Sequence, residues 1–591
     1  MRHFLSYLEI ENFKSIVHEN FQLTSYTPLV GYNNAGKTNI LHAIKWLLRK
    51  SSLPGEAFNS LDSPITVIGT ISGVDAALLE QLAENHRNSI QQYIAEDKLS
   101  IKRVQNRPND SATSIKLFVR NPNAANPQEE WVSNPSGIDN AIAILFPDPI
   151  HIGAMENSEE DVSKSKSTST IGKLLGEIIG PIENAYADDL SDALTNLREY
   201  LDSDSEGRAA ELVEFDNEVN SKLDAFFPDV NVRLHIPTPT LKDIFSKGTI
   251  KVYENQSING RDVASLGHGA QRSIQMALIR HLAELKQVND DHRTTTLLLI
   301  DEPELYLHPQ AIEVVRNALK ALSVEGYQII FSTHSAMMVT HEDVSDTILI
   351  RKNRQRGTHK RATLRAAVPQ VVEDAPSQLQ LLFSLSHSTN VLFSEKVILT
   401  EGVTEERILP KIIESLTGRS LGLHKYALVK QGGVTNTKKS MRVLEIMDLP
   451  TRCVVDLDYV FKIGVKDGFI DENDQDLKAC RDKMIAIAPE HGIALENGWP
   501  IKRGSSMSPA KAMSLLASIQ EVKENINNLH EKLKAQNIWI WKKGDIESHL
   551  NLSGKNESAW AAFTHQLTEV GFANMEVDHD EIQACINWLT N

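Results

Sequence analysis

A phosphate-binding loop near the N-terminus is the feature that most constrains how this chain can fold. The segment Gly31–Thr38 reads GYNNAGKT, in which two glycines enclose four residues and precede a lysine and a threonine. The apolar residues 25–31 predict a strand before the loop, and the residues ILHAIKWLL after it have helical spacing. In such a unit the backbone N–H groups face a phosphate, the lysine reaches the β and γ oxygens, and the threonine can hold Mg²⁺. The sequence therefore predicts an α/β unit that binds ATP with Mg²⁺. The residues expected to contact the nucleotide are Asn33, Asn34, Gly36, Lys37, Thr38 and Asn39.

Two carboxylates and a histidine complete the predicted nucleotide site. The apolar run Leu297–Ile300 predicts a buried strand that ends in Asp301 and Glu302. An NTPase needs one acid that organises Mg²⁺ and another that polarises water, and we assign these roles to Asp301 and Glu302. The next predicted strand, YQIIFS, is followed closely by His334, whose ring could contact the γ-phosphate.

The balance of charge limits how this chain could hold a nucleic acid. It has 61 basic and 78 acidic side chains, a formal net charge of -17, which is opposite in sign to what phosphate affinity favours. Any contact with a nucleic acid must therefore be local. Basic residues cluster between two predicted strands, and we interpret this run as a solvated hairpin. They are Arg351, Lys352, Arg354, Arg356, Lys360, Arg361 and Arg365.

The sequence favours a cytoplasmic location. No run approaches the ~20 apolar residues of a membrane span, and the first residues lack the apolar stretch of a signal peptide. The three cysteines, Cys453, Cys480 and Cys585, have no CxxC spacing, which excludes a zinc site built from cysteines. We expect free thiols, a reducing compartment and no membrane partner.

The pattern of predicted strands and helices indicates an α/β protein of several domains, as a length of 591 residues requires. Residues 4–10 predict a short strand, and alternating apolar and polar residues predict half-exposed strands around 64–73, 113–119 and 248–254. A block with helical spacing separates the two halves of the nucleotide-binding unit, and we interpret it as an insertion that dimerises the protein. The predicted parts are an N-terminal half over 1–165, the helical insertion over 166–235, a C-terminal half over 236–370, a linker over 371–390 and a second α/β domain over 391–591.

A second group of carboxylates follows two predicted strands of the C-terminal domain. The apolar strand KVILT delivers Glu401 at its end, and Glu405 lies four residues later on the opening turn of a helix. The strand CVV is followed by Asp456 and Asp458, and a period of two puts both on the same side of the extended chain. Hard oxygen ligands select Mg²⁺ or Mn²⁺ over zinc. These four acids therefore predict a divalent metal site.

The motifs of the nucleotide site together resemble the ABC-type ATPase heads of the SMC and RecF class. The matching segments are IENFKS, the GYNNAGKT loop, SLGHGAQRS, DEPELYLHP and STHS. The resemblance implies that two heads enclose two ATP molecules, with Gly267 and Gly269 of one head facing the γ-phosphate in the other. Many such heads have a serine where this chain has Gly267, so contacts in trans are expected from backbone N–H groups and a helix N-terminus.

The C-terminal carboxylates resemble the Toprim domain of topoisomerases, primases and certain nucleases, in which a glutamate follows one strand and a DxD pair follows a later strand. The segment WIWKKGDIESHL resembles the element that completes a two-metal site in nuclease-type members. This resemblance implies Glu547 as a further metal ligand and Lys542 or Lys543 as the cation that faces phosphate. Two ions about 4 Å apart can clamp the attacking water and the leaving oxygen of a phosphodiester, with Glu401 as base or ligand.

An ABC head followed by a Toprim domain over essentially the whole chain resembles the OLD (overcoming lysogenization defect) family of nucleases, to which the Gabija nuclease subunit also belongs. The resemblance implies a homodimer or higher assembly through the inserted helices. It also implies ATP hydrolysis, metal-dependent nicking or cleavage of DNA, and a role in defence against phage.

Other functions remain open at the level of sequence. A topoisomerase needs a tyrosine nucleophile in a separate DNA-gate domain and a primase needs a zinc module, so both are disfavoured. A RecF-like clamp, in which ATP only switches DNA binding, would leave the second group of carboxylates unexplained. The nuclease could instead cut RNA, including tRNA, or be gated by a partner such as a helicase or a retron component.

Overall fold

The computed structural model describes most of the chain, which divides into two compact units. The described residues are 3–153, 185–237, 249–289, 295–374 and 389–590, together with residues 182 and 244 and without residues 81, 134, 136, 147, 148, 225, 228, 229, 254–258, 325, 432 and 433. The first unit contains Met1–Thr27 and Lys37–Thr333, and the second contains Pro28–Gly36 and His334–Asn591. The domain boundaries expected from the sequence stay a prediction.

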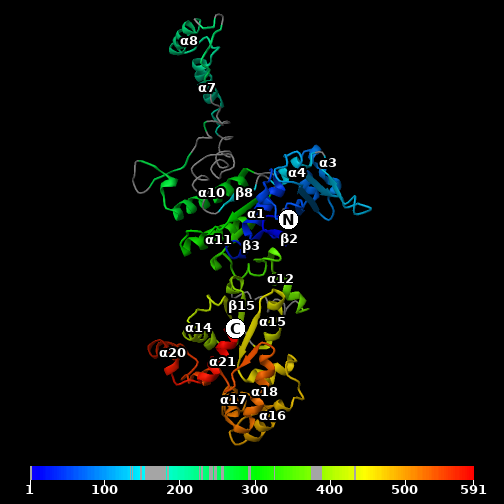
Figure 1. The fold of residues 1–591 in the computed structure, drawn as a ribbon, viewed down its shortest axis with the longest axis vertical. Helices are drawn as coiled ribbons and strands as arrows, with labels where there is room; N and C mark the ends of the chain where they lie inside the picture. Colours follow the sequence, from blue (N-terminus) through cyan, green and yellow to red (C-terminus); the bar gives the residue numbers. More distant parts are fainter. Residues whose placement is uncertain are drawn as a thin grey trace. The chain divides into compact units, whose positions relative to one another are not determined.

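Antiparallel strands build the N-terminal part of the first unit, drawn in blue in Figure 1. They are β1 (Phe4–Phe13), β2 (Ile16–Gln22), β4 (Ile65–Ser72), β5 (Lys98–Gln105), β6 (Lys116–Arg120) and β7 (Trp131–Ser133), in the order β7-β6-β5-β4-β1-β2. Every second residue of β4 is buried, as expected of a strand with one face on a core. The predicted strands over 4–10, 64–73 and 113–119 are confirmed, whereas the one over 248–254 is reduced to β9 (Lys251–Val252).

Parallel strands and helices form the rest of the first unit's core. The strands β12 (Tyr327–Thr333), β11 (Thr296–Asp301) and β8 (Ile150–Ile152) lie in that order. All residues of β11 and β12 are buried, because helices cover them. The accompanying helices are α1 (Lys37–Leu48), α10 (His268–Asn289) and α11 (Pro309–Val324).

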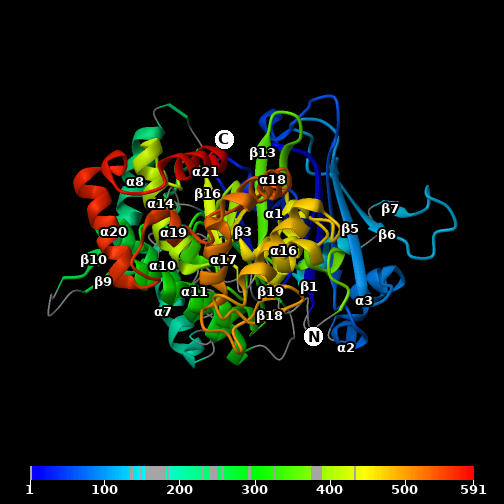
Figure 2. The same cartoon turned by 90° about the horizontal axis from the view of Figure 1, so that it is seen from below.

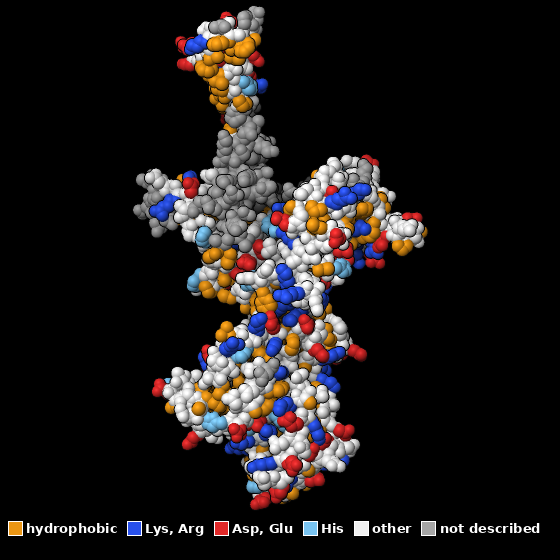
Figure 3. All heavy atoms as spheres, viewed as in Figure 1, with side chains coloured by type: hydrophobic (Ala, Val, Ile, Leu, Met, Phe, Trp, Pro, Cys, Tyr) orange, Lys and Arg blue, Asp and Glu red, His pale blue; other side chains and the backbone are white. Residues whose placement is uncertain are grey.

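Two helices occupy the described part of the predicted insertion. They are α7 (Ala187–Leu201) and α8 (Ala210–Leu223). A buried ion pair of 2.9 Å joins Arg208, in the loop between them, to Asp216 of α8. Residues 166–181 of the insertion lie outside the described residues. The pair exposes Tyr200, Phe226 and Phe227, with 59%, 77% and 61% of each residue accessible, and Figure 3 shows hydrophobic side chains gathered on its surface.

The second unit contains a parallel four-stranded sheet with helices on both faces. Its strands are β16 (Tyr426–Lys430), β15 (Lys396–Thr400), β17 (Thr451–Val455) and β20 (Ile538–Ile540), in that order. One face packs against α14 (Val403–Thr417), α20 (Glu557–Val570) and α21 (His579–Thr590). The other face packs against α15 (Thr437–Ile446), α16 (Gln475–Ile487), α17 (Pro509–Ser518) and α18 (Lys523–Lys534), some of which are visible from below in Figure 2. This doubly covered sheet confirms the predicted α/β class.

The remaining expectations about the fold concern the linker, the thiols and membranes. Of the predicted linker over 371–390, only residues 371–374 and 389–390 are described. The three cysteines are buried free thiols, as predicted. Among the described residues, no helix has the length and apolar character to cross a membrane.

Candidate functional site

The phosphate-binding loop has the predicted strand, loop and helix context. The strand β3 (Tyr26–Gly31) is buried along its length, and α1 begins directly after Gly36. Asn34 and Gly36 adopt positive φ angles of 64° and 102°, which turn the backbone sharply around the loop. Asn33 and Asn34 are exposed and Lys37 is buried. The loop is therefore shaped like a cradle for a phosphate.

The two residues predicted to hold Mg²⁺ in the nucleotide site lie together. The hydroxyl of Thr38 donates a hydrogen bond of 2.7 Å to Oδ2 of Asp301. The hydroxyl of Ser332, on the neighbouring strand, donates to the other oxygen of Asp301. A threonine hydroxyl beside a buried carboxylate is the pairing that binds Mg²⁺ in P-loop NTPases.

The other predicted residues of this site lie on the elements expected for them. Glu302 follows β11 with a φ of 47°, and Arg272 donates a hydrogen bond of 3.1 Å to its carbonyl. Asn39 donates a hydrogen bond of 2.7 Å to Ser15, so its amide supports the loop before β2. His334 is the first residue after β12. The roles of these residues in catalysis stay predictions.

In the segment SLGHGAQRS, Gly267 and Gly269 lie at the start of α10. A Cβ atom on Gly269 would lie 2.7 Å from the carbonyl oxygen of Tyr306, whereas a Cβ atom on Gly267 would meet nothing within 4 Å. The first turn of this long helix therefore packs directly against the backbone that follows β11.

This difference predicts opposite outcomes for two alanine substitutions. Gly269→Ala is expected to lower stability by about 1–3 kcal/mol, because a backbone carbonyl cannot move aside as a side chain can. Gly267→Ala is the matched control, expected to stay within about 0.5 kcal/mol of the wild type, since its site is open. Thermal unfolding of the two variants measures the difference, and equal melting temperatures would contradict it.

The second group of carboxylates gathers at the carboxyl ends of the parallel strands in the second unit. Glu401 follows β15, and Asp456 and Asp458 follow β17. The backbone N–H of Asp456 donates a hydrogen bond of 3.1 Å to Glu401, which joins the two strand ends. Glu405 projects from the first turn of α14, and Glu547 from α19 (Ile546–Leu550) after β20. Ligands bind at this edge in parallel α/β sheets.

Burial and the charges of neighbouring acids raise the pKa of three of these carboxyl groups. Burial, and then the charge of Asp458, raise the pKa of Glu401 to about 7. Burial, followed by the charges of Glu547 and Glu401, raises the pKa of Glu405 to about 7. The pKa of Asp456 is raised well above its usual range by burial and by Glu401. The carboxylates therefore form one electrostatically coupled cluster, which a bound cation would stabilise.

The sequence analysis missed two lysines of this cluster. Lys462 forms an ion pair of 3.4 Å with Asp458. Lys555 contacts several of the acids. Its Nζ lies 3.1 Å from Glu547, 3.3 Å from Asp545 and 3.8 Å from Asp456. Although burial opposes its charge, these carboxylates raise the pKa of Lys555 above its usual value. Lys555 precedes α20 in a polar loop, and no motif in the sequence marks it.

The two lysines predicted for this role lie elsewhere. Lys542 forms an ion pair of 2.7 Å with Glu581, and Lys543 forms one of 2.8 Å with Asp578. Among the described ion pairs, Lys555 contacts the predicted metal ligands Glu547 and Asp456, whereas Lys542 and Lys543 do not. The structure therefore places Lys555, and neither Lys542 nor Lys543, beside these predicted ligands. The chain bends after β20, so that Trp541 rather than a lysine turns toward the cluster.

Neighbouring side chains hold the carboxylates of Glu405 and Glu547 in place. The indole N–H of Trp541 donates a hydrogen bond of 3.3 Å to Glu405, and the hydroxyl of Thr404 donates to Glu547. Asp545 caps α19, since its Oδ1 accepts a hydrogen bond of 2.9 Å from the backbone N–H of Ser548. Such outer contacts fix ligand orientation in metal sites.

The donor chemistry of the cluster fits a divalent cation. Among the described residues, no three Asp, Glu, His or Cys side chains are already gathered as a set of metal ligands. However, the coupled carboxylates supply hard oxygen donors, and Oε2 of Glu547, 3.1 Å from Nζ of Lys555, already faces a cation. The residues therefore fit Mg²⁺ or Mn²⁺, provided that the side chains close around the ion.

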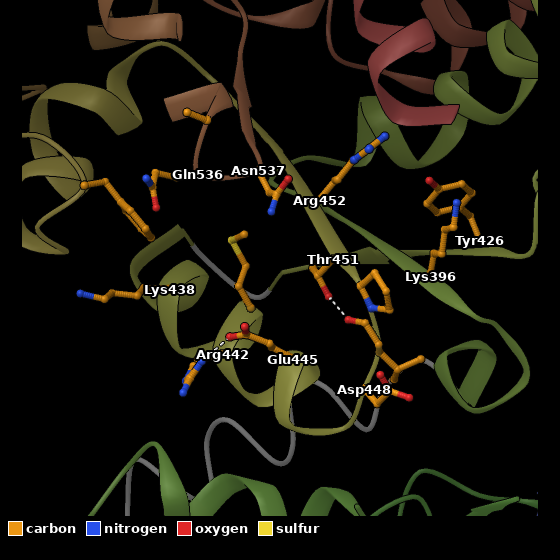
Figure 4. A pocket seen from close by; sticks show the side chains of 15 residues that line it. Lys396, Tyr426, Lys438, Arg442, Glu445, Asp448, Thr451, Arg452, Gln536 and Asn537 are labelled. Carbon is orange, nitrogen blue, oxygen red and sulfur yellow. Dashed lines mark hydrogen bonds and ion pairs between the residues drawn. The ribbon is translucent and has the colours of Figure 1, made fainter. Parts of the chain in front are cut away.

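A cavity of about 820 Å³ at the opposite edge of the same sheet does not hold this chemistry. Lys396, Tyr426 and Arg452, at the amino ends of three strands, line it together with residues of α15 (Figure 4). None of the predicted catalytic residues is among its lining residues.

Comparisons with known proteins match both parts of the chain. Residues 27–338 match the family described as "AAA domain, putative AbiEii toxin, Type IV TA system", and residues 392–458 match "Overcoming lysogenization defect protein-like, TOPRIM domain". The chain is 35% identical to the Old nuclease of Escherichia phage P2 over 99% of both chains. It is 24% identical to the OLD nuclease of Thermus scotoductus over 43% of this chain and 49% of that protein. The Smc head domain of Pyrococcus furiosus covers 63% of this chain with 99% of its own, at 15% identity and a TM-score of 0.37, too low to carry an argument.

Proposed function

This chain belongs to the OLD family of nucleases, and from that premise we propose that it hydrolyses ATP and cuts DNA with Mg²⁺ or Mn²⁺ at its Toprim domain. The observation that carries the proposal is the coupled cluster of carboxylates with Lys555 at the carboxyl edge of the parallel sheet. An acidic cluster with a lysine beside several of its acids suits phosphodiester cleavage, since the acids would hold cations and the lysine would face a phosphate.

We assign the metal ligands of the nuclease site to the five clustered acids. They are Glu401, Glu405, Asp456, Asp458 and Glu547. Two divalent ions bound there would supply an activated water and neutralise the leaving oxygen. Glu401, with its pKa raised to about 7, is placed to act as ligand or base. Lys555 takes the role that the sequence analysis gave to Lys542 or Lys543.

We assign ATP hydrolysis to the phosphate-binding loop and its partners. Thr38 and Asp301, joined at 2.7 Å, would hold Mg²⁺, while Glu302 polarises water and His334 contacts the γ-phosphate. The residues assigned to nucleotide contacts are Asn33, Asn34, Gly36, Lys37 and Asn39, and Gly267 and Gly269 from a second copy.

A second copy is supported by the surface of the α7–α8 pair. Tyr200, Phe226 and Phe227 are all more than half exposed, and a patch of large apolar side chains of this kind is typical of an interface. We therefore propose a homodimer formed through these helices. A role in defence against phage is also proposed, and it rests on the family resemblance.

The test is cleavage of supercoiled plasmid by the purified full-length protein. We expect nicked or linear product with Mg²⁺ or Mn²⁺ and none with a chelator, because metal-free carboxylates repel a phosphodiester. Parallel reactions with and without ATP would show whether the nucleotide activates or restrains cleavage. Cleavage of RNA or tRNA alone would favour the RNA-directed alternative. Intact DNA and RNA beside ongoing ATP hydrolysis would favour a RecF-like clamp or gating by a helicase or retron partner.

The assignment of Lys555 makes a separate prediction. Lys555→Ala is expected to lower the rate of DNA cleavage by about 100-fold, because the site loses a charged contact to the transferred phosphate. Lys542→Ala and Lys543→Ala are matched controls that remove lysines paired with Glu581 and Asp578. Initial rates on plasmid would measure all three variants. A larger loss in either control than in Lys555→Ala would return the role to the original lysines.

A further inference from the structure

The hairpin formed by β13 (Ile348–Asn353) and β14 (Gly357–Lys360) carries exposed cations at its tip. Lys352, Arg354 and Arg356 are all exposed. The ion pairs described nearby join Arg361 to Asp448 and Arg365 to Asp346, and none of those described involves the three tip cations. The tip is therefore a small surface of uncompensated positive charge on a chain with a net charge of -17.

Side-chain hydrogen bonds close the backbone of the turn that carries these cations. The side chain of Asn353 accepts hydrogen bonds of 3.0 Å from the backbone N–H of Gln355 and 2.7 Å from that of Arg356. Gly357 has a φ of 64° and pairs with Asn353 where the second strand begins. A closed turn of this kind reduces the conformational entropy that the tip loses on binding.

The base of the hairpin is bonded to the phosphate-binding loop. The hydroxyl of Thr358 donates a hydrogen bond of 2.8 Å to the carbonyl of Ala35. The guanidinium of Arg351 lies 4.7 Å from the ring centre of Tyr32 and donates a hydrogen bond of 3.0 Å to the carbonyl of Ser394, next to β15. The strand β13 also pairs with β3, labelled beside it in Figure 2. The hairpin is therefore held between the nucleotide loop and the start of the Toprim sheet.

We propose that Lys352, Arg354 and Arg356 bind the phosphate backbone of DNA during the reaction. The inference rests on the proposed function and names a DNA-holding surface for it. A cluster of carboxylates repels the polyanion, so a positive surface elsewhere is needed to retain the strand. Long flexible cations without carboxylate partners suit contacts to phosphates, which are independent of base sequence.

The test compares DNA binding by two triple variants in a nuclease-silent Asp456→Asn background. The first carries Lys352→Gln, Arg354→Gln and Arg356→Gln. The matched control carries Lys502→Gln, Arg503→Gln and Lys511→Gln, three exposed cations of the same unit. Fluorescence anisotropy with labelled duplex DNA, repeated across salt concentrations, would give the affinity and its salt dependence. Melting temperatures would confirm that each variant is folded.

The hairpin variant is expected to bind at least about tenfold more weakly in 0.1 M salt, with a salt slope smaller by about 2 to 3, because each phosphate contact contributes about 0.9. The control should match the parent. Equal affinities and slopes in both variants would overturn the hairpin assignment while plasmid cleavage by the wild type still supports the nuclease. A loss of affinity for RNA alone would overturn the choice of DNA. A parent that binds no DNA would overturn the hairpin assignment, whereas the absence of plasmid cleavage by the wild type would overturn the proposed function.

Discussion

Replacing Asp456 by asparagine is expected to lower the rate of DNA cleavage by at least about a thousandfold. The side chain of Asp456 lies in the coupled cluster, where its backbone N–H binds Glu401 and Lys555 lies 3.8 Å away. The substitution keeps the shape of the side chain but removes a negative charge that a divalent cation needs. Plasmid cleavage under saturating Mg²⁺ or Mn²⁺ measures the loss.

ATP hydrolysis by the same variant is expected to continue, because the phosphate-binding loop and Asp301 are unchanged. Asp482→Asn is the matched control, since Asp482 is an exposed acid on α16 of the same unit. The control should cut DNA at the wild-type rate. Wild-type cleavage by Asp456→Asn would remove the carboxylate cluster from the mechanism.

Replacing Lys37 by alanine is expected to lower the rate of ATP hydrolysis by about 100-fold or more, because the lysine would neutralise the β and γ phosphates as charge develops. Lys37 is buried at the start of α1, directly after the loop. Release of phosphate from ATP measures the effect. Lys45→Ala is the matched control, because Lys45 is an exposed lysine on the same helix.

The response of DNA cleavage to Lys37→Ala would decide how the two sites are coupled. Lost cleavage would mean that ATP activates the nuclease, and increased cleavage would mean that ATP restrains it. Normal ATP hydrolysis by Lys37→Ala would contradict the nucleotide site proposed here.

The sequence was a good guide wherever the chemistry lies next to a strand end. Glu401 and Asp456 follow apolar runs that could only be buried strands, and the carboxyl ends of parallel strands meet at one edge. The same reasoning placed Thr38 and Asp301 in one site, and the structure joins them at 2.7 Å. These residues were predictable because a strand of known direction carries them.

The sequence did not predict which lysines lie beside the carboxylates. It missed Lys555 and pointed instead to Lys542 and Lys543. The position of a lysine in a loop between helices depends on how those helices pack, and no local pattern records that packing. Two lysines directly after β20 seemed better placed than one in the loop before α20. However, Glu581 and Asp578, near the start of α21, pair with both of them.

By itself, the sequence determined the α/β class, the nucleotide loop, the paired carboxylates and the family, because each is written in short segments whose period or spacing has one physical meaning. Only the tertiary structure decided which lysines join the acids, how burial and the charge of Asp458 raise the pKa of Glu401, and how the β13–β14 hairpin is anchored to the loop at Ala35. Those properties depend on distances between segments far apart in the chain, and such distances are fixed by packing.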